Sequence, residues 1–228
     1  MNNTYLLGLD LGQAGDYTGL TIFECLNNKR PPVYHLRHVE RLKLGLSYPK
    51  QVDLVAERLA RIPGISTLVL DATGVGRPVV DMIRQRRLLT TIIAVTITGG
   101  NTVNETDKDT FTVPKRDLVS TLQVLFQNAR LKVAQGLPQG ELLIEELLNF
   151  KVKINVNNHD SYEAWRDKDH DDLVLSAALA LWYAERKPPV EFSFIPVPKS
   201  TLFGESARYD PDDDENESST WGGRGGGY

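Results

Sequence analysis

Five aspartates in this sequence stand at the ends of apolar segments: Asp10, Asp71, Asp169, Asp171 and Asp172. Asp10 lies within the apolar run 5–11, and Asp71 ends the run 67–71. The other three precede the apolar, helix-like segment 173–183. Burying an unpaired charge is costly, so carboxylates in such positions require partners. Separated carboxylates at the edges of buried elements indicate a divalent-metal site.

Two Mg²⁺ or Mn²⁺ ions would suit these carboxylates. Both metals prefer hard oxygen ligands. Two such ions about 3.5–4 Å apart activate a water molecule and stabilise the leaving oxygen of a phosphodiester. We expect Asp10, Asp71 and Asp172 to be the catalytic ligands, because each would project from a rigid element. Structural explanations also exist, since Asp71 could cap the next turn and Asp171 or Asp172 could be acids favoured by a helix N-terminus.

The composition is that of an ordinary globular protein. Its 228 residues are 41% hydrophobic and 25% charged, which is enough for one domain with a sizeable core. The formal net charge is −4, but the segment 210–217 alone contains six acids. The rest of the chain is therefore close to neutral, and the net charge does not exclude nucleic acid as a partner.

We expect a cytoplasmic location. Cys25 is the only cysteine, so no disulfide framework can form. The N-terminal residues lack the basic and apolar regions of a signal peptide. No uncharged apolar stretch approaches the roughly 20 residues needed to cross a bilayer.

The order of the apolar segments predicts an α/β fold. We expect strands at 5–11, 18–24, 33–44, 67–71 and 91–97, and helices at 48–61, 77–87, 114–130, 138–150 and 171–186. Three consecutive strands followed by alternating helices and strands are typical of this class. Alternating residues predict a β-hairpin over 152–166, and the polar stretch 99–112 is expected to be a mobile loop. The domain should span 1–190, and the polar, acidic and finally Gly-rich segment 191–228 should be disordered.

Four motifs in order resemble one family of nucleases. They are Leu9-Asp10-Leu11-Gly12, the segment from Leu70 to Gly76, the segment from Val113 to Val119, and the segment from His170 to Ala180. Their order and spacing resemble the nuclease domain of the large terminases of tailed bacteriophages. That family has a ribonuclease H-like fold, shared with RuvC-type resolvases. The resemblance covers most of residues 5–186.

The resemblance implies both a fold and an activity. The fold would be a mixed central β-sheet flanked by helices, with an additional β-hairpin near the active site. The activity would be cleavage of double-stranded viral DNA during genome packaging with two Mg²⁺ or Mn²⁺ ions, bound by Asp10, Asp71 and Asp172. The RuvC-like pattern adds an acid about one turn before the helix acid. Asp169 has that spacing and Asp171 is the adjacent competitor, so this choice stays open.

The motor of a full large terminase is missing from this sequence. No Gly-x-x-x-x-Gly-Lys-Ser/Thr phosphate loop occurs, and the segment 74–78 lacks both the lysine and the hydroxyl. We expect either an excised nuclease domain or a free-standing relative. Its partners would be a separate packaging ATPase, the portal or the small terminase subunit.

Six basic residues are candidates for contacts with DNA phosphates: Lys115, Arg116, Lys151, Lys153, Arg166 and Lys168. The first two begin a predicted helix, and the other four belong to the predicted hairpin and its return. For each of them alone a solubilising surface role is the simpler interpretation. The hairpin group is favoured for DNA contact because it flanks the acidic cluster on both sides.

Other functions remain possible for such a chain. A Holliday-junction resolvase of the same fold would need a dimer with two sites at a set spacing. A non-catalytic nucleic-acid-binding module would keep the acids without metal binding. The run 8–12 also resembles the first phosphate loop of actin-like nucleotide-binding proteins, but those need two domains, for which 228 residues are too few.

Overall fold

The computed structural model describes residues 4–12, 15–26, 29–74, 76–156 and 171–186, with the backbone alone for 76, 77 and 150–156. These residues fall within one compact unit, Met1–Pro189. Asp169, Arg166, Lys168 and the segment 191–228 lie outside the described residues, so the expectations for them stay predictions. Among the described residues, no helix has the length and apolar character needed to span a membrane.

An eight-stranded mixed sheet forms the centre of the unit, in the order β6-β7-β5-β4-β1-β2-β3-β8. The strands are β1 (Thr4–Asp10), β2 (Thr18–Leu26), β3 (Val33–Leu42), β4 (Ser66–Asp71), β5 (Thr90–Thr98), β6 (Asn104–Asp107), β7 (Thr110–Pro114) and β8 (Leu131–Val133). The first three are an antiparallel meander. β4, β5 and β7 then extend the sheet parallel to β1, so their carboxyl ends share one edge with the end of β1.

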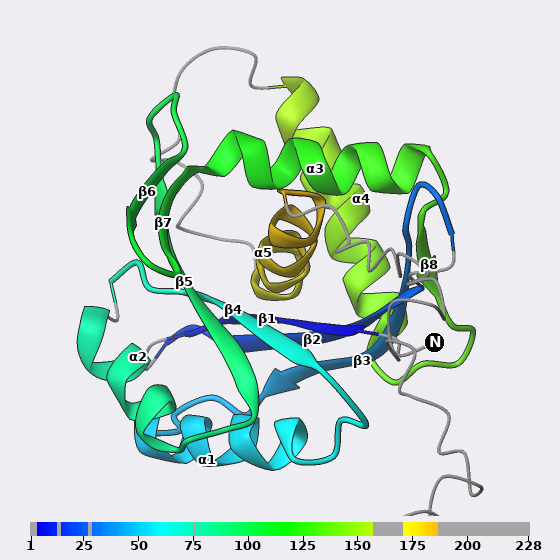
Figure 1. The fold of residues 1–228 in the computed structure, drawn as a ribbon. Helices are drawn as coiled ribbons and strands as arrows, with labels where there is room; N and C mark the ends of the chain where they lie inside the picture. Colours follow the sequence, from blue (N-terminus) through cyan, green and yellow to red (C-terminus); the bar gives the residue numbers. More distant parts are fainter. Residues whose placement is uncertain (1–3, 13–14, 27–28, 75, 157–170, 187–228) are drawn as a thin grey trace, which may run out of the picture. The chain divides into compact units, whose positions relative to one another are not determined.

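Within the described residues, five helices cover the two faces of this sheet, as Figure 1 shows. They are α1 (Tyr48–Leu59), α2 (Gly76–Gln85), α3 (Lys115–Gln127), α4 (Gly140–Val156) and α5 (Asp172–Arg186). α1 and α2 lie on one face, and α3, α4 and α5 lie on the other. Successive side chains of β1 point to opposite faces of the sheet. Leu7 and Leu9 pack in the core with α1 and α2, whereas Leu6 packs in the core with α5.

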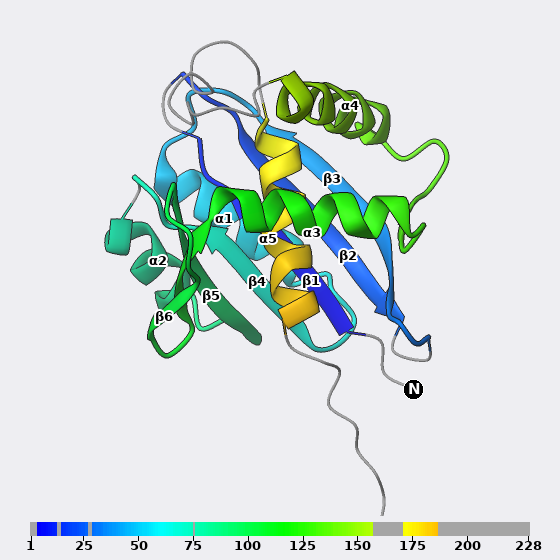
Figure 2. The same cartoon turned by 90° about the horizontal axis from the view of Figure 1, so that it is seen from above.

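α5 is enclosed by the sheet below it and by other helices above it. Every residue from Asp172 to Tyr183 is buried, which explains why this helix has no polar face in the sequence. α3 crosses over it on the side away from the sheet (Figure 2). The helix is therefore held from both sides, and the residue at its start has little freedom to move.

Two glycines allow α5 to lie directly against the sheet. A Cβ at Gly8 in β1 would stand 1.6 Å from the carbonyl oxygen of Ser176. A Cβ at Gly19 in β2 would stand 2.3 Å from the carbonyl oxygen of Asp172. Ser176 and Asp172 are four residues apart, so the helix touches the sheet on successive turns of one face.

The sequence-based prediction of a hairpin over 152–166 is wrong where the structure describes it. Residues 152–156 continue α4 as a helix, and Lys151 and Lys153 belong to that helix. Extending an existing helix adds one hydrogen bond for each residue that is ordered, so local alternation does not stop it. The return of the predicted hairpin lies outside the described residues.

The predicted mobile loop over 99–112 is also wrong, because it contains a real hairpin. β6 and β7 pair antiparallel, and β7 adds to the edge of the sheet beside β5. All four residues of β6 are polar and exposed, so no apolar alternation marks this strand in the sequence. The three-residue β8 was missed for a similar reason, since its backbone pairing with β3 is what defines it.

Replacing Gly8 by alanine should destabilise the protein strongly. The new methyl group would overlap a backbone carbonyl of α5, which cannot rotate away as a side chain can. We expect a loss in the free energy of unfolding at or above the usual ~1–3 kcal/mol for overpacking, measured by urea denaturation. Gly99→Ala is the control, since a Cβ there meets nothing within 4 Å. Equal stability of the two variants would contradict the close packing of α5.

Candidate metal-binding carboxylate site

Asp10 and Asp71 are brought together by the pairing of β1 with β4. The two strands are parallel, and their register pairs Leu9 with Leu70. The next residues on the two strands are the two aspartates, which therefore lie side by side. Alternation directs both toward α5, because Leu6 and Val69, on the same faces of their strands, belong to the core around that helix.

Asp172 is placed beside Asp10 by the contact between α5 and β2. In the antiparallel register of β1 and β2, Asp10 is paired with Gly19. The main chain of Asp172 lies directly over that glycine. The first residue of α5 is thus held next to the last residue of β1, and three carboxylates from distant segments meet at one edge of the sheet.

Asp71 is oriented by the turn that follows it. Its Oδ1 accepts a hydrogen bond from the backbone N–H of Thr73 at 2.7 Å. The Thr73 hydroxyl in turn accepts a 2.7 Å hydrogen bond from the backbone N–H of Ile97 in β5. Gly74 then adopts φ of +76°, which favours glycine. Asp71 therefore does cap the turn that follows it. This hydrogen bond fixes the orientation of the carboxylate and is compatible with metal binding by the same side chain.

Two basic side chains each contact one of the acids at the start of α5. The Nζ of Lys115, at the start of α3, lies 3.3 Å from Oδ2 of Asp171. The Nη2 of Arg41, in β3, lies 3.6 Å from Oδ2 of Asp172. Arg41 also forms an ion pair with Glu146 of α4. Positive charge therefore flanks the carboxylates from both sides.

Arg41 and Glu146 were not found by sequence reasoning. Arg41 is paired with Gly19 in the register of β2 and β3, so it lies in the same row across the sheet as Asp10. Glu146 lies on α4, 105 residues away along the chain. Neither residue belongs to a motif, and only the register of the sheet and the position of α4 bring them to the carboxylates.

Burial and mutual repulsion both act on the carboxylates. Burial raises the pKa of Asp10 well above its ordinary value, and the charges of Asp71, Asp172 and Asp171 raise this pKa further. Lys115 acts in the opposite direction. Burial also raises the pKa of Glu146 to about 7, opposed by Arg41 and by the backbone N–H of Val174. Ionising Asp10 in the metal-free site therefore costs free energy that Lys115 does not fully offset.

This set of donors fits a divalent cation. Carboxylate oxygens are the ligands that Mg²⁺ and Mn²⁺ prefer, and a bound cation would offset the repulsion that raises the pKa of Asp10. Within the part of the chain that the structure describes, no three acidic, histidine or cysteine side chains already stand as a formed metal cluster. Binding would thus require rotation of these side chains about fixed backbone positions.

The proposed DNA-contacting residues are placed unequally. Lys115 lies at the carboxylates through its ion pair with Asp171. Arg116 is half-exposed, and its Nη2 donates a 2.9 Å hydrogen bond to the carbonyl oxygen of Asn101, beside the β6–β7 hairpin. Lys151 and Lys153 lie on α4, where the structure describes the backbone alone.

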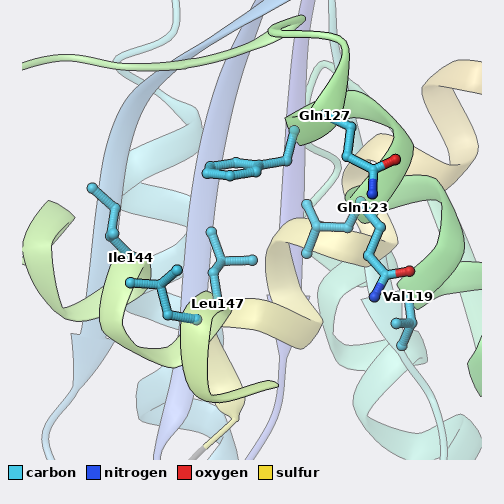
Figure 3. Close-up of a pocket in the computed structure, with 8 residues that line it drawn as sticks. Val119, Gln123, Gln127, Ile144 and Leu147 are labelled. Atoms are coloured by element: carbon cyan, nitrogen blue, oxygen red, sulfur yellow. The ribbon is translucent and has the colours of Figure 1, made fainter. Parts of the chain in front are cut away.

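The helical layer also contains an apolar pocket (Figure 3). It lies between α3 and α4, and its lining contains no acidic residue. The lining residues are Val119, Leu122, Gln123, Phe126, Gln127, Ile144, Leu147 and Leu148. Oxygen ligands for a hard cation are limited there to two amides, so this pocket is not the metal site.

Known structures resemble this chain over most of its length. The large terminase nuclease of the thermophilic phage G20c is 18% identical, with 78% of this chain and 81% of that chain covered and a TM-score of 0.51. The human cytomegalovirus terminase nuclease domain, in a manganese-soaked and inhibitor-bound structure, is 13% identical, with coverage of 79% and 82% and a TM-score of 0.50. The large terminase of another thermophilic bacteriophage is 8% identical, with coverage of 79% and 39% and a TM-score of 0.51.

These similarities establish a ribonuclease H-like fold and confirm the predicted fold class. No protein-family model matches the sequence, and no curated protein matches it. The identities are low, so the likeness concerns the path of the backbone rather than the side chains. The positions of the carboxylates on that backbone come from the geometry described above.

Replacing Asp10 by asparagine should stabilise the metal-free protein at neutral pH. The pKa of Asp10 is raised in the folded state, so ionising this carboxyl costs free energy that the unfolded chain does not incur. That cost is absent when the pH lies below about 3.9, the pKa of an aspartate in the unfolded chain. It is complete when the pH lies above the pKa of Asp10 in the folded protein. The gain in unfolding free energy should therefore be larger at pH 7 than at pH 4.

Urea denaturation in EDTA at the two pH values measures this gain. The exposed Asp81 of α2 supplies the control, because Asp81→Asn removes a carboxylate outside the cluster. A gain for Asp10→Asn that is no larger at pH 7 than at pH 4 would show that Asp10 is not under electrostatic strain.

Proposed function

We propose that this protein is a metal-dependent endonuclease that cleaves double-stranded viral DNA during genome packaging, as the nuclease of a large terminase. The observation that carries the proposal is the meeting of Asp10, Asp71 and Asp172 at one edge of a ribonuclease H-like sheet. Each comes from a different segment, and their shared negative charge is maintained at a cost. Costly, buried charge clusters of this kind are typical of functional sites.

The residues divide into metal ligands and phosphate-binding residues. Asp10, Asp71 and Asp172 would hold the ions, with Asp171 and Asp169 as further candidate ligands. Bound Mg²⁺ or Mn²⁺ would supply an activated water molecule and stabilise the leaving oxygen of the phosphodiester. Arg116 would attract the DNA backbone without reading bases. Lys115, which already neutralises Asp171, would add to the positive charge beside the site.

The similar structures support the assignment of a metal and of partners. The human cytomegalovirus domain was soaked with manganese, which is consistent with a hard divalent ion in this fold. The chain covers only 39% of the large terminase from the second thermophilic bacteriophage. A packaging ATPase, the portal and the small terminase subunit are the partners that this proposal implies. Lys151, Lys153, Arg166 and Lys168 remain candidates for further DNA contacts.

Asp10→Asn, Asp71→Asn and Asp172→Asn should each abolish DNA cleavage. Each substitution removes a charged ligand while keeping the side-chain shape, so the fold should remain intact. We expect plasmid nicking in Mg²⁺ or Mn²⁺ to fall by about a hundredfold or more, the upper end of the loss known for supporting residues of metal sites. EDTA should abolish the activity of the wild-type protein.

Asp81→Asn is the matched control, and it should nick plasmid at the wild-type rate. Wild-type nicking by any one of the three variants would remove that residue from the site. Comparing Asp169→Asn with Asp171→Asn under the same conditions would decide which of these two acids also binds metal.

Ca²⁺ should support DNA binding but not cleavage. It accepts looser coordination than Mg²⁺, so it would hold the reacting oxygens less rigidly. Gel-shift assays should show complexes in Ca²⁺ while nicking assays show none. Equal rates of nicking in Ca²⁺ and in Mg²⁺ would contradict a two-ion mechanism.

A further inference from the structure

Arg41 occupies a more enclosed position than the other base at the site. Its side chain is 13% exposed, and its two acidic neighbours Glu146 and Asp172 are 8% and 11% exposed. Lys115 and Asp171 are 19% and 27% exposed. Ion pairs are screened less as water is excluded, so the charge of Arg41 acts more strongly on Asp172 than an exposed base would.

The position of the Arg41 guanidinium is determined from several sides. Its backbone is paired with Gly19 in the sheet. The guanidinium carbon lies 4.8 Å from the centre of the Tyr17 ring, which is a cation–π contact. Glu146 completes the enclosure, and its other carboxylate oxygen accepts a 3.3 Å hydrogen bond from the backbone N–H of Val174 in α5. These contacts hold the guanidinium of Arg41 in place between Glu146 and Asp172.

Glu146 and Asp172 compete for this single positive charge. Arg41 contacts both carboxylates, with the closer approach to Glu146. Without Glu146 the guanidinium would lose the closer of the two acids that the described residues place against it, and it would pair more closely with Asp172. A carboxylate oxygen held by a guanidinium is less available to a divalent cation, and the positive charge of the guanidinium repels the cation.

We propose that Arg41 is the built-in counter-cation of the carboxylate site, and that Glu146 sets how much of its charge reaches Asp172. This inference rests on the proposed metal binding and adds two positioning residues to it. In the metal-free protein Arg41 limits the repulsion among the buried acids. Glu146 holds the guanidinium, so that the oxygens of Asp172 stay available to the ion. Neither residue needs to touch the metal or the DNA.

Glu146→Gln should weaken metal binding. The titration is made at pH 8, above the pKa of about 7 that burial gives Glu146. At that pH glutamine keeps an acceptor for the N–H of Val174 but removes the charge that competes for Arg41. We expect the dissociation constant for Mn²⁺ to rise about tenfold, the lower end of the effect of supporting residues around metal sites. The measurement is titration of the full chain with Mn²⁺, followed by the electron paramagnetic resonance signal of the free ion.

Arg41→Met should act in a different way. Methionine keeps an unbranched apolar side chain but leaves Glu146 and Asp172 without their shared cation. The melting temperature in EDTA should fall by about 5 °C or more, because breaking a buried ion pair leaves uncompensated charge. The Mn²⁺ dissociation constant should not rise, since a competing cation has been removed.

The double variant tests whether Glu146 acts through Arg41. If it does, Glu146→Gln should have no effect on Mn²⁺ binding in the Arg41→Met background, a non-additivity expected of residues in direct contact. Glu145→Gln is the matched control. Its carboxylate is on the preceding residue of α4 but exposed, so it should change neither the melting temperature nor the affinity.

Three results would overturn the inference while leaving the proposed function standing. The first is an unchanged Mn²⁺ affinity in Glu146→Gln. The second is an equal loss of affinity from Glu146→Gln in both backgrounds, which would make Glu146 a direct ligand. The third is a weaker affinity in Arg41→Met, which would make Arg41 a simple support for Asp172. Absence of Mn²⁺ binding by the wild-type protein would instead overturn the proposed function itself.

Discussion

The direct contact between α5 and the first two strands is the constraint on which this structure depends. Gly8 and Gly19 let the helix backbone lie where any larger residue would overlap a carbonyl group. The same contact places Asp172 over the strand residue that pairs with Asp10. Stability and chemistry are therefore joined at one interface, because a shift of the helix would both open the core and separate the carboxylates.

The carboxylates themselves work against the fold. Gathering them at one buried edge raises the pKa of Asp10, and the metal-free protein bears the cost of that repulsion. Lys115 and Arg41 reduce the cost without removing it. Repulsion among these carboxylates lowers the stability of the metal-free protein, but it favours the binding of a divalent cation. Functional sites often reduce the stability of a fold in this way.

The helical layer above α5 contributes to the site as well as to the core. α3 brings Lys115 to Asp171 from one side, and α4 brings Glu146 to Arg41 from the other. Residues of both helices also line the apolar pocket of Figure 3, and no acidic residue is among them. A single helix such as α4 thus separates two environments, because successive residues of a helix point in different directions.

The sequence by itself determined the strands of the meander, the buried last helix and the candidate aspartates Asp10, Asp71 and Asp172. These signals are local, since apolar periodicity and a carboxylate at the end of a buried run are visible within a few residues. Only the tertiary structure decided the roles of Arg41 and Glu146, which are 105 residues apart and meet through strand register and helix position. It also replaced the predicted hairpin at 152–156 with a helix and found one at β6 and β7. β6 has no apolar alternation, and it forms because β7 beside it offers backbone hydrogen bonds. The residues of β6 alone do not reveal this neighbour.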